Sequence, residues 1–246
     1  MKILDINELL QAHPYPGRGI VLGRSADGQK AVIIYFIMGR SENSRNRVLE
    51  ASGDGIRTRA YDESKMVDPS LIIYHPVRRV GEVTVVTNGD QTDTIRDSLL
   101  AGKSYIDALR TRCYEPDGPN YTPRISGVVD QDGSFCLSIL KSADGDPACS
   151  HRYFYEYDAP LAGEGRFIHT YQENAEPLPS FEGEPRRVSV SAPDADTLAS
   201  QVWASLNEDN KVSLFVQYIH LATGERETVI LNKHGEQAHA ASKVPN

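Results

Sequence analysis

Three arginines and four small polar side chains lie together in residues 40–47, RSENSRNR, directly after the most apolar run of the chain. A guanidinium group can donate two hydrogen bonds to one phosphate, and serine and asparagine side chains add neutral donors. The chain as a whole has a formal net charge of −8, so this local positive cluster indicates a bound anion. The alternative is a solvated loop whose arginines form surface ion pairs.

Residues 87–94, TNGDQTDT, form the junction between an expected strand and an expected helix, and most of their side chains can hydrogen-bond. Free backbone N–H groups at the start of a helix favour an anion or the polar edge of a ligand. Alternatively, Asp90 or Thr92 serves only to cap the helix. Both interpretations stay open on the sequence of this segment alone.

A third polar segment, residues 112–124, leaves a helix through a loop bracketed by prolines and enters a strand at Arg124. Within this segment Tyr114 directly precedes Glu115. A phenol and a carboxyl group with an arginine nearby could move protons and hold an anionic intermediate, although acidic loops without such a role are common. Residues 169–185 add an extended loop, stiffened by prolines, that could form one wall of a site.

The composition excludes several classes of protein. The chain has 246 residues, with 26 Lys and Arg against 34 Asp and Glu, and a general nucleic-acid binder would instead carry a basic face. The longest apolar run, residues 31–38, is far shorter than the roughly 20 residues that span a bilayer. The phosphate-binding loop, the dinucleotide fingerprint, the nucleophile elbow and H-E-x-x-H do not occur. This favours chemistry without a metal or a cofactor.

The cysteines bear on the cellular compartment. The chain has an odd number of cysteines, Cys113, Cys136 and Cys149, and none of them is part of a C-x-x-C pair. We therefore expect reduced, mostly buried thiols in a cytosolic protein, and no structural zinc site. Acidic residues near the N-terminus interrupt any signal-peptide core.

The elements that must position the polar segments are mostly strands. Glycine-containing pairs at residues 27–28, 132–133 and 223–224 predict three hairpins between apolar runs, because glycine accepts the positive φ of tight turns. Further strands are expected at residues 71–74, 82–87, 153–157 and 167–171. An arginine pair at residues 78–79 separates the first two of them.

Helices are fewer. One is expected at residues 92–101, because a glycine follows as a stop signal. A second is expected from Ser104 to about Cys113, because Ser104 begins a capping pattern. The third is expected at residues 194–206, where apolar residues recur at a four-residue spacing. About ten strands joined mainly by hairpins, with three or four helices, predict an α+β fold with mostly antiparallel sheets.

Several short motifs between about Gly19 and Phe181 follow one another in the order found in a known protein family. They are Gly39-Arg40-Ser41 with Asn43 and Arg45, Val80-Gly81-Glu82, Asn88-Gly89-x-x-Thr92-Asp93-Thr94-Ile95, Tyr114-Glu115, Thr122-Pro123-Arg124-Ile125, and Thr170-Tyr171 with Glu176-Pro177. Together they resemble the archaeal-type IMP cyclohydrolase family, and the chain is most similar to the bacterial IMP cyclohydrolase-like branch of that family.

This resemblance implies a fold and an activity. The fold would be a four-layer αββα sandwich similar to the N-terminal-nucleophile hydrolases. The activity would be closure of 5-formamidoimidazole-4-carboxamide ribonucleotide to inosine monophosphate and water in purine biosynthesis. The resemblance also implies a cytoplasmic homo-oligomer that binds a purine ribonucleotide, uses no cofactor or metal, and has neither a nucleic acid nor a membrane as partner.

The same resemblance implies roles for individual residues. The carboxamide nitrogen attacks the formyl carbon, so an enzyme must align the two groups, accept one proton and donate another. Proton transfer falls to Glu115, with the phenols of Tyr114 and Tyr74 as donors and Arg40 near the formyl oxygen. Candidates for binding the 5′-phosphate are Arg45, Arg47 and Arg124, and candidates for the ribose and base edge are Asn88, Thr92, Asp93 and Thr94. We expect these groups to converge on one pocket.

The chain is longer than the archaeal pattern. We expect one domain over residues 1–246, with an N-terminal extension of about residues 1–17 and a polar tail of about residues 233–246. The main alternative to a cyclohydrolase is a purine-ribonucleotide-binding paralogue with a different or regulatory role. A structural or interaction module is a third class, and the polar content of the four loops is contrary to it.

Overall fold

Strands dominate the computed structural model, which describes residues 2–143, 145–235 and 238–242. Two seven-stranded sheets are present in these residues. The first sheet has the order β11-β10-β1-β2-β12-β13-β14 and consists of β1 (Arg18–Arg24), β2 (Lys30–Met38), β10 (Glu164–His169), β11 (Arg186–Ser189), β12 (Lys211–His220), β13 (Arg226–Asn232) and β14 (Ala238–Ser242). The second has the order β3-β4-β5-β6-β7-β8-β9 and consists of β3 (Arg47–Ser52), β4 (Gly55–Ala60), β5 (Val77–Val80), β6 (Val83–Thr87), β7 (Arg124–Val129), β8 (Phe135–Ala143) and β9 (Asp146–Tyr157).

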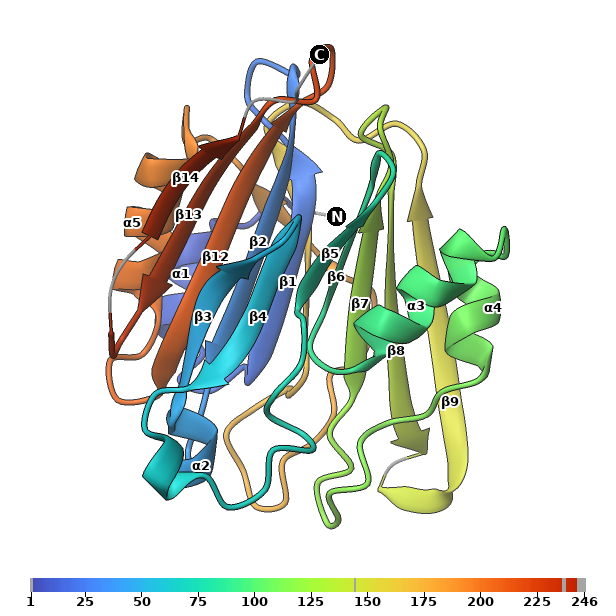
Figure 1. Cartoon of the computed structure of the whole chain (residues 1–246), viewed down its shortest axis with the longest axis vertical. Coiled ribbons are helices and arrows are strands. Elements are labelled where there is room, and N and C mark those ends of the chain that lie inside the picture. The colour runs from blue at the N-terminus through green and yellow to red at the C-terminus, as the bar shows by residue number, and fades with distance from the viewer. Residues whose placement is uncertain (1, 144, 236–237, 243–246) are drawn as a thin grey trace.

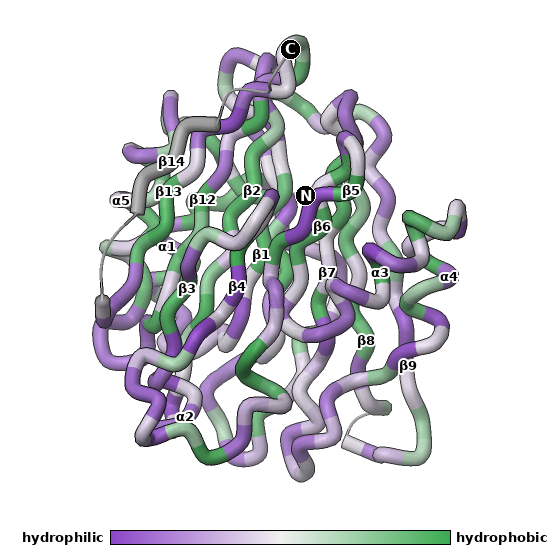
Figure 2. The backbone as a smooth tube through the Cα atoms, in the orientation of Figure 1, coloured by the Kyte–Doolittle hydropathy of each residue, from purple (hydrophilic) through white to green (hydrophobic). Residues whose placement is uncertain are grey.

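The two sheets pack face to face, and helices cover their outer faces (Figure 1). Side chains from both sheets, among them Ile20, Tyr35, Ile125, Leu137 and Phe215, form the core between the sheets. Figure 2 shows hydrophobic stretches along central strands such as β2 and β12 and hydrophilic ones in many connecting loops. The helices are α1 (Ile6–Ala12), α2 (Glu42–Arg45), α3 (Gln91–Leu100), α4 (Tyr105–Arg110) and α5 (Ala195–Ser205), with a 3₁₀ turn at Glu63–Lys65.

Each outer face has its own apolar cluster. Helices α1 and α5 pack on the first sheet, with Ile6, Leu10 and Leu198 in the cluster. Helices α3 and α4 cover the second sheet, with Ile95 and Leu109 in the cluster. None of the described helices is both long enough and apolar enough to cross a bilayer.

The α+β prediction with mostly antiparallel sheets is confirmed. Every register recorded between two named strands is antiparallel, and the parallel pairing among the described residues is one isolated bridge, Leu4 to Val188. The three predicted hairpins are β1–β2, β7–β8 and β12–β13. Their turn glycines, Gly28, Gly133 and Gly224, have φ of 71°, 84° and 69°, as tight turns require.

The predicted helices are also present, with small shifts of their ends. Ser104 caps α4 by accepting a hydrogen bond from the N–H of Asp107, and Asp194 caps α5 through the N–H of Thr197. Helix α3 has Asp90 at its N-cap position, but the side chain makes no capping hydrogen bond. The Asp90 carboxylate therefore has a different role, described below.

The strand predicted at residues 71–74 is wrong. That segment is an irregular connection, and Thr58 of β4 holds it: the Thr58 hydroxyl donates to the carbonyl of Ile72 at 2.7 Å and accepts from the N–H of Tyr74 at 2.8 Å. The arginine pair thought to separate strands lies inside one, β5. Its charges are tolerated there because Arg78 pairs with Asp93 and Arg79 with a carboxylate three residues later.

The β3–β4 hairpin was not predicted. Along β4 buried and exposed residues alternate, and Arg57 and Arg59 on the exposed positions both pair with Glu50 of β3. Because charged and uncharged side chains alternate along β4, it contains no continuous apolar run from which a strand could be predicted.

The expected polar tail is partly a strand. Residues 238–242 form β14, whereas residues 236–237 and 243–246 lie outside the described residues.

The expectation of mostly buried cysteines is also wrong. Cys113 and Cys149 are exposed and Cys136 is half-buried, all three as free thiols. Cys113 lies in the loop that follows α4, and Cys149 lies on β9, the edge strand of its sheet. Neither belongs to an apolar cluster, whereas Cys136 packs against the cluster under α3 and α4.

Candidate active site

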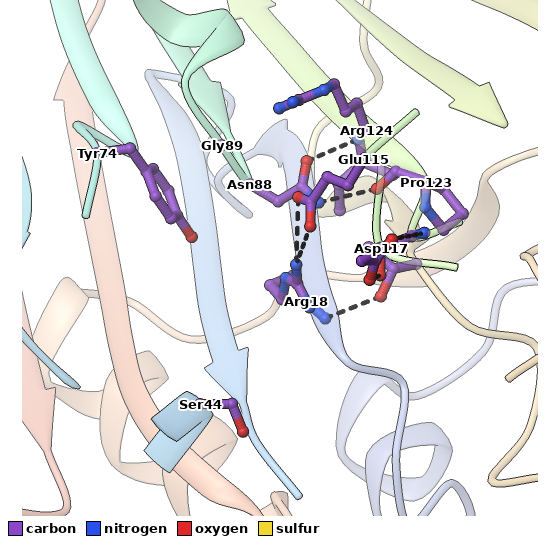
Figure 3. Close-up of polar contacts among 12 residues, drawn as sticks. Arg18, Ser44, Tyr74, Asn88, Gly89, Glu115, Asp117, Pro123 and Arg124 are labelled. Carbon is purple, nitrogen blue, oxygen red and sulfur yellow. Dashed lines mark hydrogen bonds and ion pairs between the residues drawn. The ribbon is translucent and has the colours of Figure 1, made fainter. Parts of the chain in front are cut away.

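A buried ion pair lies where loop and strand ends of the two sheets meet. Arg18, the first residue of β1, contacts Glu115, which belongs to the loop between α4 and β7. The Arg18 Nη2 lies 3.1 Å from one carboxylate oxygen of Glu115 and 3.3 Å from the other (Figure 3). Their side chains are only 10% and 3% exposed, so the pair is largely removed from water.

Burial raises the pKa of Glu115, although the charges of Arg18 and Arg124 act in the opposite direction. Taking a carboxylate out of water disfavours its charged form, and here that effect exceeds the attraction of the guanidinium groups. A carboxyl group in such surroundings holds its proton at a higher pH than an exposed glutamate does. This is a property that acid–base catalysts in enzymes share.

Arg124, the first residue of β7, lies against the start of α3. Its Nη1 donates to Gln91 Oε1 at 2.8 Å and lies 2.7 Å from the carboxylate of Asp90. A Cβ atom at Gly89 would lie 2.7 Å from this nitrogen and 3.6 Å from Glu115 Oε1. The absence of a side chain at Gly89 therefore allows Arg124 and Glu115 to approach the same short piece of backbone.

Asn88 connects β6 to the beginning of β7. Its side-chain nitrogen donates to the carbonyl of Pro123 at 2.8 Å, and its side-chain oxygen accepts from the N–H of Ile125 at 2.8 Å and from Gln91 at 3.0 Å. Thr92 is fully buried and hydrogen-bonds the Thr87 hydroxyl at 2.6 Å. In this structure both side chains hold the strand-to-helix junction together.

Tyr74 and Arg47 also lie near the ion pair: the charge of Arg47 acts on Glu115, and Arg47 interacts with Tyr74. The hydroxyls of Tyr74 and Tyr35 are 2.7 Å apart, and both rings are buried. Figure 3 shows the Tyr74 hydroxyl directed toward the region that Arg18 and Glu115 occupy. Arg47, the first residue of β3, is 2% exposed, and its Nε donates to the carbonyl of Ser44 at 2.9 Å.

Four buried guanidinium groups in the described part of the chain each keep a nitrogen that has no hydrogen-bond partner. Three of these nitrogens, Arg18 Nε, Arg47 Nη1 and Arg124 Nε, belong to the residues described above, and the fourth is Arg226 Nε on β13. Buried polar groups in native proteins are almost always hydrogen-bonded, so each exception needs an explanation. A bound anion would supply the missing acceptors of the first three.

Arg40 and Tyr114 make their hydrogen bonds elsewhere. Arg40 donates to Asn174, to the carbonyl of Ala175 and to Glu176 at 3.1–3.2 Å, and it thereby holds the extended loop that follows β10. The Tyr114 hydroxyl donates to the carbonyl of Pro147 at 2.6 Å. Each of the two joins a loop to a neighbouring segment.

Three further candidates also have local partners. Arg45 donates to the carbonyl of Gly39 and to Asn210. Asp93 pairs with two arginines on the outer face of the second sheet, Arg78 and Arg96. The Thr94 hydroxyl accepts from Arg112 at 3.3 Å. The structure thus gathers Tyr74, Asn88, Glu115, Arg47 and Arg124 around one centre, while the other candidates lie around it.

Arg18, the direct partner of Glu115, was not predicted from the sequence. The signal was present, because Arg18 stands between two glycines at the beginning of an apolar run. A Cβ atom at Gly19 would lie 2.2 Å from the ring of Phe36, and one at Gly17 would lie 2.2 Å from Thr170 Oγ1. The two glycines let the backbone on either side of the buried arginine pack closely against Thr170 and Phe36.

A pocket of ≈ 390 Å³ has Tyr74 and Asp90 in its wall, whereas Arg18, Arg47, Glu115 and Arg124 do not line it. Arg57, Arg59 and His75 also line it. Among the described residues no cluster of three or more His, Cys, Asp or Glu side chains is arranged to hold a metal ion.

Comparison with known proteins identifies the family. The profile of the family described as IMP cyclohydrolase-like protein matches residues 15–225. A protein of Methanococcus maripaludis strain C5 named IMP cyclohydrolase is 31% identical over 178 residues, which cover 68% of this chain and 86% of that protein. The protein of the same name from Methanosphaera stadtmanae is 29% identical over 185 residues, 74% of this chain and 81% of that protein. In the one from Methanococcus maripaludis strain S2, identity is 36% over 133 residues, 52% of this chain and 64% of that protein. The chain therefore belongs to the IMP cyclohydrolase-like family.

Proposed function

We propose that this protein closes 5-formamidoimidazole-4-carboxamide ribonucleotide to inosine monophosphate and water. The family and its relatives named IMP cyclohydrolase support this reaction. The structural observation that carries the proposal is the buried Glu115, held by Arg18 and surrounded by guanidinium groups with unpartnered nitrogens. It combines an acid–base group with a site for an anion.

Ring closure requires two proton movements. The carboxamide nitrogen forms a bond to the formyl carbon, giving a tetrahedral carbinolamine, and the C–O bond then breaks as water leaves. Glu115 accepts the proton of the attacking carboxamide N–H and passes it to the formyl oxygen, which gives the carbinolamine hydroxyl. It then accepts the proton of the formamido N–H as the C=N bond forms and passes it to the departing hydroxyl, so one water leaves and the Glu115 carboxylate is restored. A placed acid–base group contributes about 10²–10⁴-fold in rate, and alignment of the two groups on one substrate contributes further.

The Tyr74–Tyr35 pair supports the formyl oxygen. One of the two hydroxyls, 2.7 Å apart, donates to the other, which leaves a second hydrogen free for a substrate oxygen. A donor aimed at an oxygen that gains negative charge stabilises the transition state more than the ground state. In this proposal Arg40 and Tyr114 hold the surrounding loops, through the contacts described above.

The charge of the site favours an anion such as a nucleotide monophosphate. Arg18, Arg47, Arg124 and Arg112 carry four positive charges, and Glu115, Asp90 and Asp117 carry three negative ones, which leaves an excess of one. A phosphate monoester carries close to two negative charges near neutral pH. We assign the phosphate to Arg47 and Arg124, whose free nitrogens supply donors.

The finer points of architecture belong to the same proposal. The two facing sheets, with apolar clusters under helices on both outer faces, support a four-layer αββα sandwich similar to the N-terminal-nucleophile hydrolases. We propose that residues 1–246 act as one domain, in the cytoplasm and as a homo-oligomer. The reaction would need neither a cofactor nor a metal.

The direct test is ring closure by the purified protein. We expect the ultraviolet absorbance of the formylated carboxamide ribonucleotide to change to that of inosine monophosphate, and Glu115→Gln to lower kcat with little change in KM. Folded protein that binds inosine monophosphate but closes no ring would contradict the proposal. That result would favour the paralogue with a regulatory role.

A further inference from the structure

The loop that carries Glu115 is closed by side chains that the proposed reaction does not use. The carboxylate of Asp117 accepts from the backbone N–H of Thr122 at 2.7 Å and from the Thr122 hydroxyl. The Thr122 hydroxyl also lies 2.6 Å from the hydroxyl of Tyr171. The carbonyl of Thr122 accepts from the N–H of Glu115 at 2.9 Å. Figure 3 shows Asp117 close to the Arg18–Glu115 pair.

The chemistry of the three groups fixes the direction of these hydrogen bonds. An ionised carboxylate can only accept, so the single hydrogen of the Thr122 hydroxyl goes to Asp117. The Tyr171 hydroxyl must then donate to Thr122. The result is an ordered chain from Tyr171 through Thr122 to Asp117, in which each hydroxyl has one assigned acceptor.

This chain ties the loop to the framework of the first sheet. Thr122 is 1% and Tyr171 2% exposed. The Tyr171 ring stacks on Tyr15, with ring centroids 5.8 Å apart, and the Tyr171 carbonyl contacts ring nitrogens of His13 and His169 at 3.1 Å and 2.8 Å. A buried and fully paired group of this kind resists displacement.

We propose that Asp117, acting through Thr122 and Tyr171, is the positioning residue that fixes the Glu115 carboxyl group opposite Arg18. Asp117 need not contact the substrate. It closes the turn from Glu115 to Thr122 and anchors that turn to Tyr171. The inference rests on the proposed function, because it assigns Asp117 to the same catalytic carboxyl group.

The pKa of Glu115 supplies a second, independent readout. Burial is the main cause of the raised pKa of Glu115; the charged groups that act on it are Arg18, Arg124 and Arg47, which lower the pKa, and Asp117, which raises it. Thr122→Val breaks the chain but keeps the charge of Asp117, so movement of the Glu115 carboxyl group away from Arg18 should raise the pKa of Glu115. A residue that served the stability of the loop alone would leave Glu115 opposite Arg18 and its pKa unchanged.

The test compares Asp117→Asn and Thr122→Val with Thr122→Ser. We expect the first two to lower kcat about 10- to 100-fold with KM within about threefold, since a small misplacement of a catalytic group reduces the rate strongly. Thr122→Ser keeps the hydroxyl and should restore kcat. In Thr122→Val the limb of the pH–rate profile assigned to Glu115 should also move to higher pH.

Asp132→Asn is the matched control. Asp132 accepts from the N–H and the hydroxyl of Ser134 at 2.8 Å and 2.6 Å, the same pattern as at Asp117, but in the exposed β7–β8 turn. It should leave kcat and the pH profile unchanged. If Asp117→Asn keeps the kcat of the parent protein, or if Asp132→Asn loses as much, the positioning role is refuted.

A measurement without substrate separates this inference from the proposed function. The midpoint of Glu115 titration can be followed by ¹³C NMR of its carboxyl group, with Glu115→Gln to assign the signal. A higher midpoint in Thr122→Val, with no change in Thr122→Ser or Asp132→Asn, supports the inference even if no ring closure is found, because Arg18 then no longer lowers the pKa of Glu115. An unchanged midpoint in Thr122→Val overturns it, whatever the activity.

Discussion

Glu115 lies in surroundings that oppose its own ionisation, with its side chain 3% exposed and one ion-pair partner, Arg18. Burial of an ion pair costs desolvation energy that the mutual attraction repays only in part. The raised pKa of Glu115 is a direct sign of that cost. Such a site is costly for stability and suited to proton transfer, a combination that is common where enzymes place catalytic groups.

This cost predicts a pH dependence of stability. Because the pKa of Glu115 is raised in the folded state, the folded chain binds this proton more tightly than the unfolded chain does. The stabilisation that comes from protonated Glu115 is therefore fully present below the ordinary glutamate pKa and is lost as pH rises through the folded-state pKa of Glu115. Urea unfolding of the parent protein and Glu115→Gln between about pH 5 and about pH 8 should show the parent losing stability relative to the variant. A constant difference between the two would contradict this.

A second prediction concerns Gly89. A Cβ atom there would lie 2.7 Å from both Arg124 Nη1 and Gln91 Oε1, so Gly89→Ala must displace the guanidinium group from its place beside Glu115. Loss of one charge-assisted hydrogen bond to a phosphate weakens affinity roughly 10- to 150-fold. We expect calorimetry to show inosine monophosphate binding weakened by this factor, with thermal unfolding close to that of the parent. Unchanged affinity would show that Arg124 does not hold the phosphate.

At the scale of elements, three of the buried arginines share one position. Arg18, Arg47 and Arg124 are the first residues of β1, β3 and β7, and these strands begin at the same end of the molecule (Figure 1). At a strand end the core between the sheets opens, so a long charged side chain can point inward without displacing apolar ones. The sheets thus bring together residues that are far apart in the sequence.

The elements also show what the sequence could predict. Turn glycines such as Gly28 and Gly133 predicted the central hairpins, because positive φ is a local requirement. Glu115 and Arg124 were recognised from local chemistry and a family resemblance. Arg18 was not, because its importance comes from a contact across 97 positions of sequence and from glycines that matter only once the sheets are packed. Local patterns identify turns, whereas the partner of a buried charge depends on tertiary structure.

Helix α1 lies entirely within the expected N-terminal extension of about residues 1–17, yet it packs against the core. Leu10 is 1% exposed and belongs to the cluster beneath α5. We expect Leu10→Ala to lower the free energy of unfolding by about 2–5 kcal/mol, since it leaves a cavity. Leu100→Ala, at a position 70% exposed, is the control and should change stability by less than about 0.5 kcal/mol. Equal effects in urea unfolding would show that α1 contributes little to the core.

At the scale of the whole molecule, the charge distribution poses a problem for an anionic substrate. The net charge of −8 repels a nucleotide at long range, but charges beyond about 10 Å are largely screened at 0.1 M salt. Buried guanidinium groups are screened much less, and a cleft lined by one sign of charge can focus the field on a ligand. The site must therefore attract its anion through a few buried arginines rather than through the surface.

Arg45 and Arg47 allow this to be tested within one short segment. Arg47 is 2% exposed and keeps an unpartnered nitrogen, whereas Arg45 lies nearer the surface and donates to Gly39 and Asn210. Each substitution by Ala removes one positive charge, so the two variants have the same net charge. We expect Arg47→Ala to weaken inosine monophosphate binding roughly 10- to 150-fold, about 1.5–3 kcal/mol, and Arg45→Ala to bind nearly as the parent does. Calorimetry at low and high salt distinguishes a direct contact with the phosphate from an effect of net charge. An effect of net charge would be equal in both variants and would decrease as the salt concentration rises. Equal losses in the two variants would place the anion at the surface rather than in the buried site.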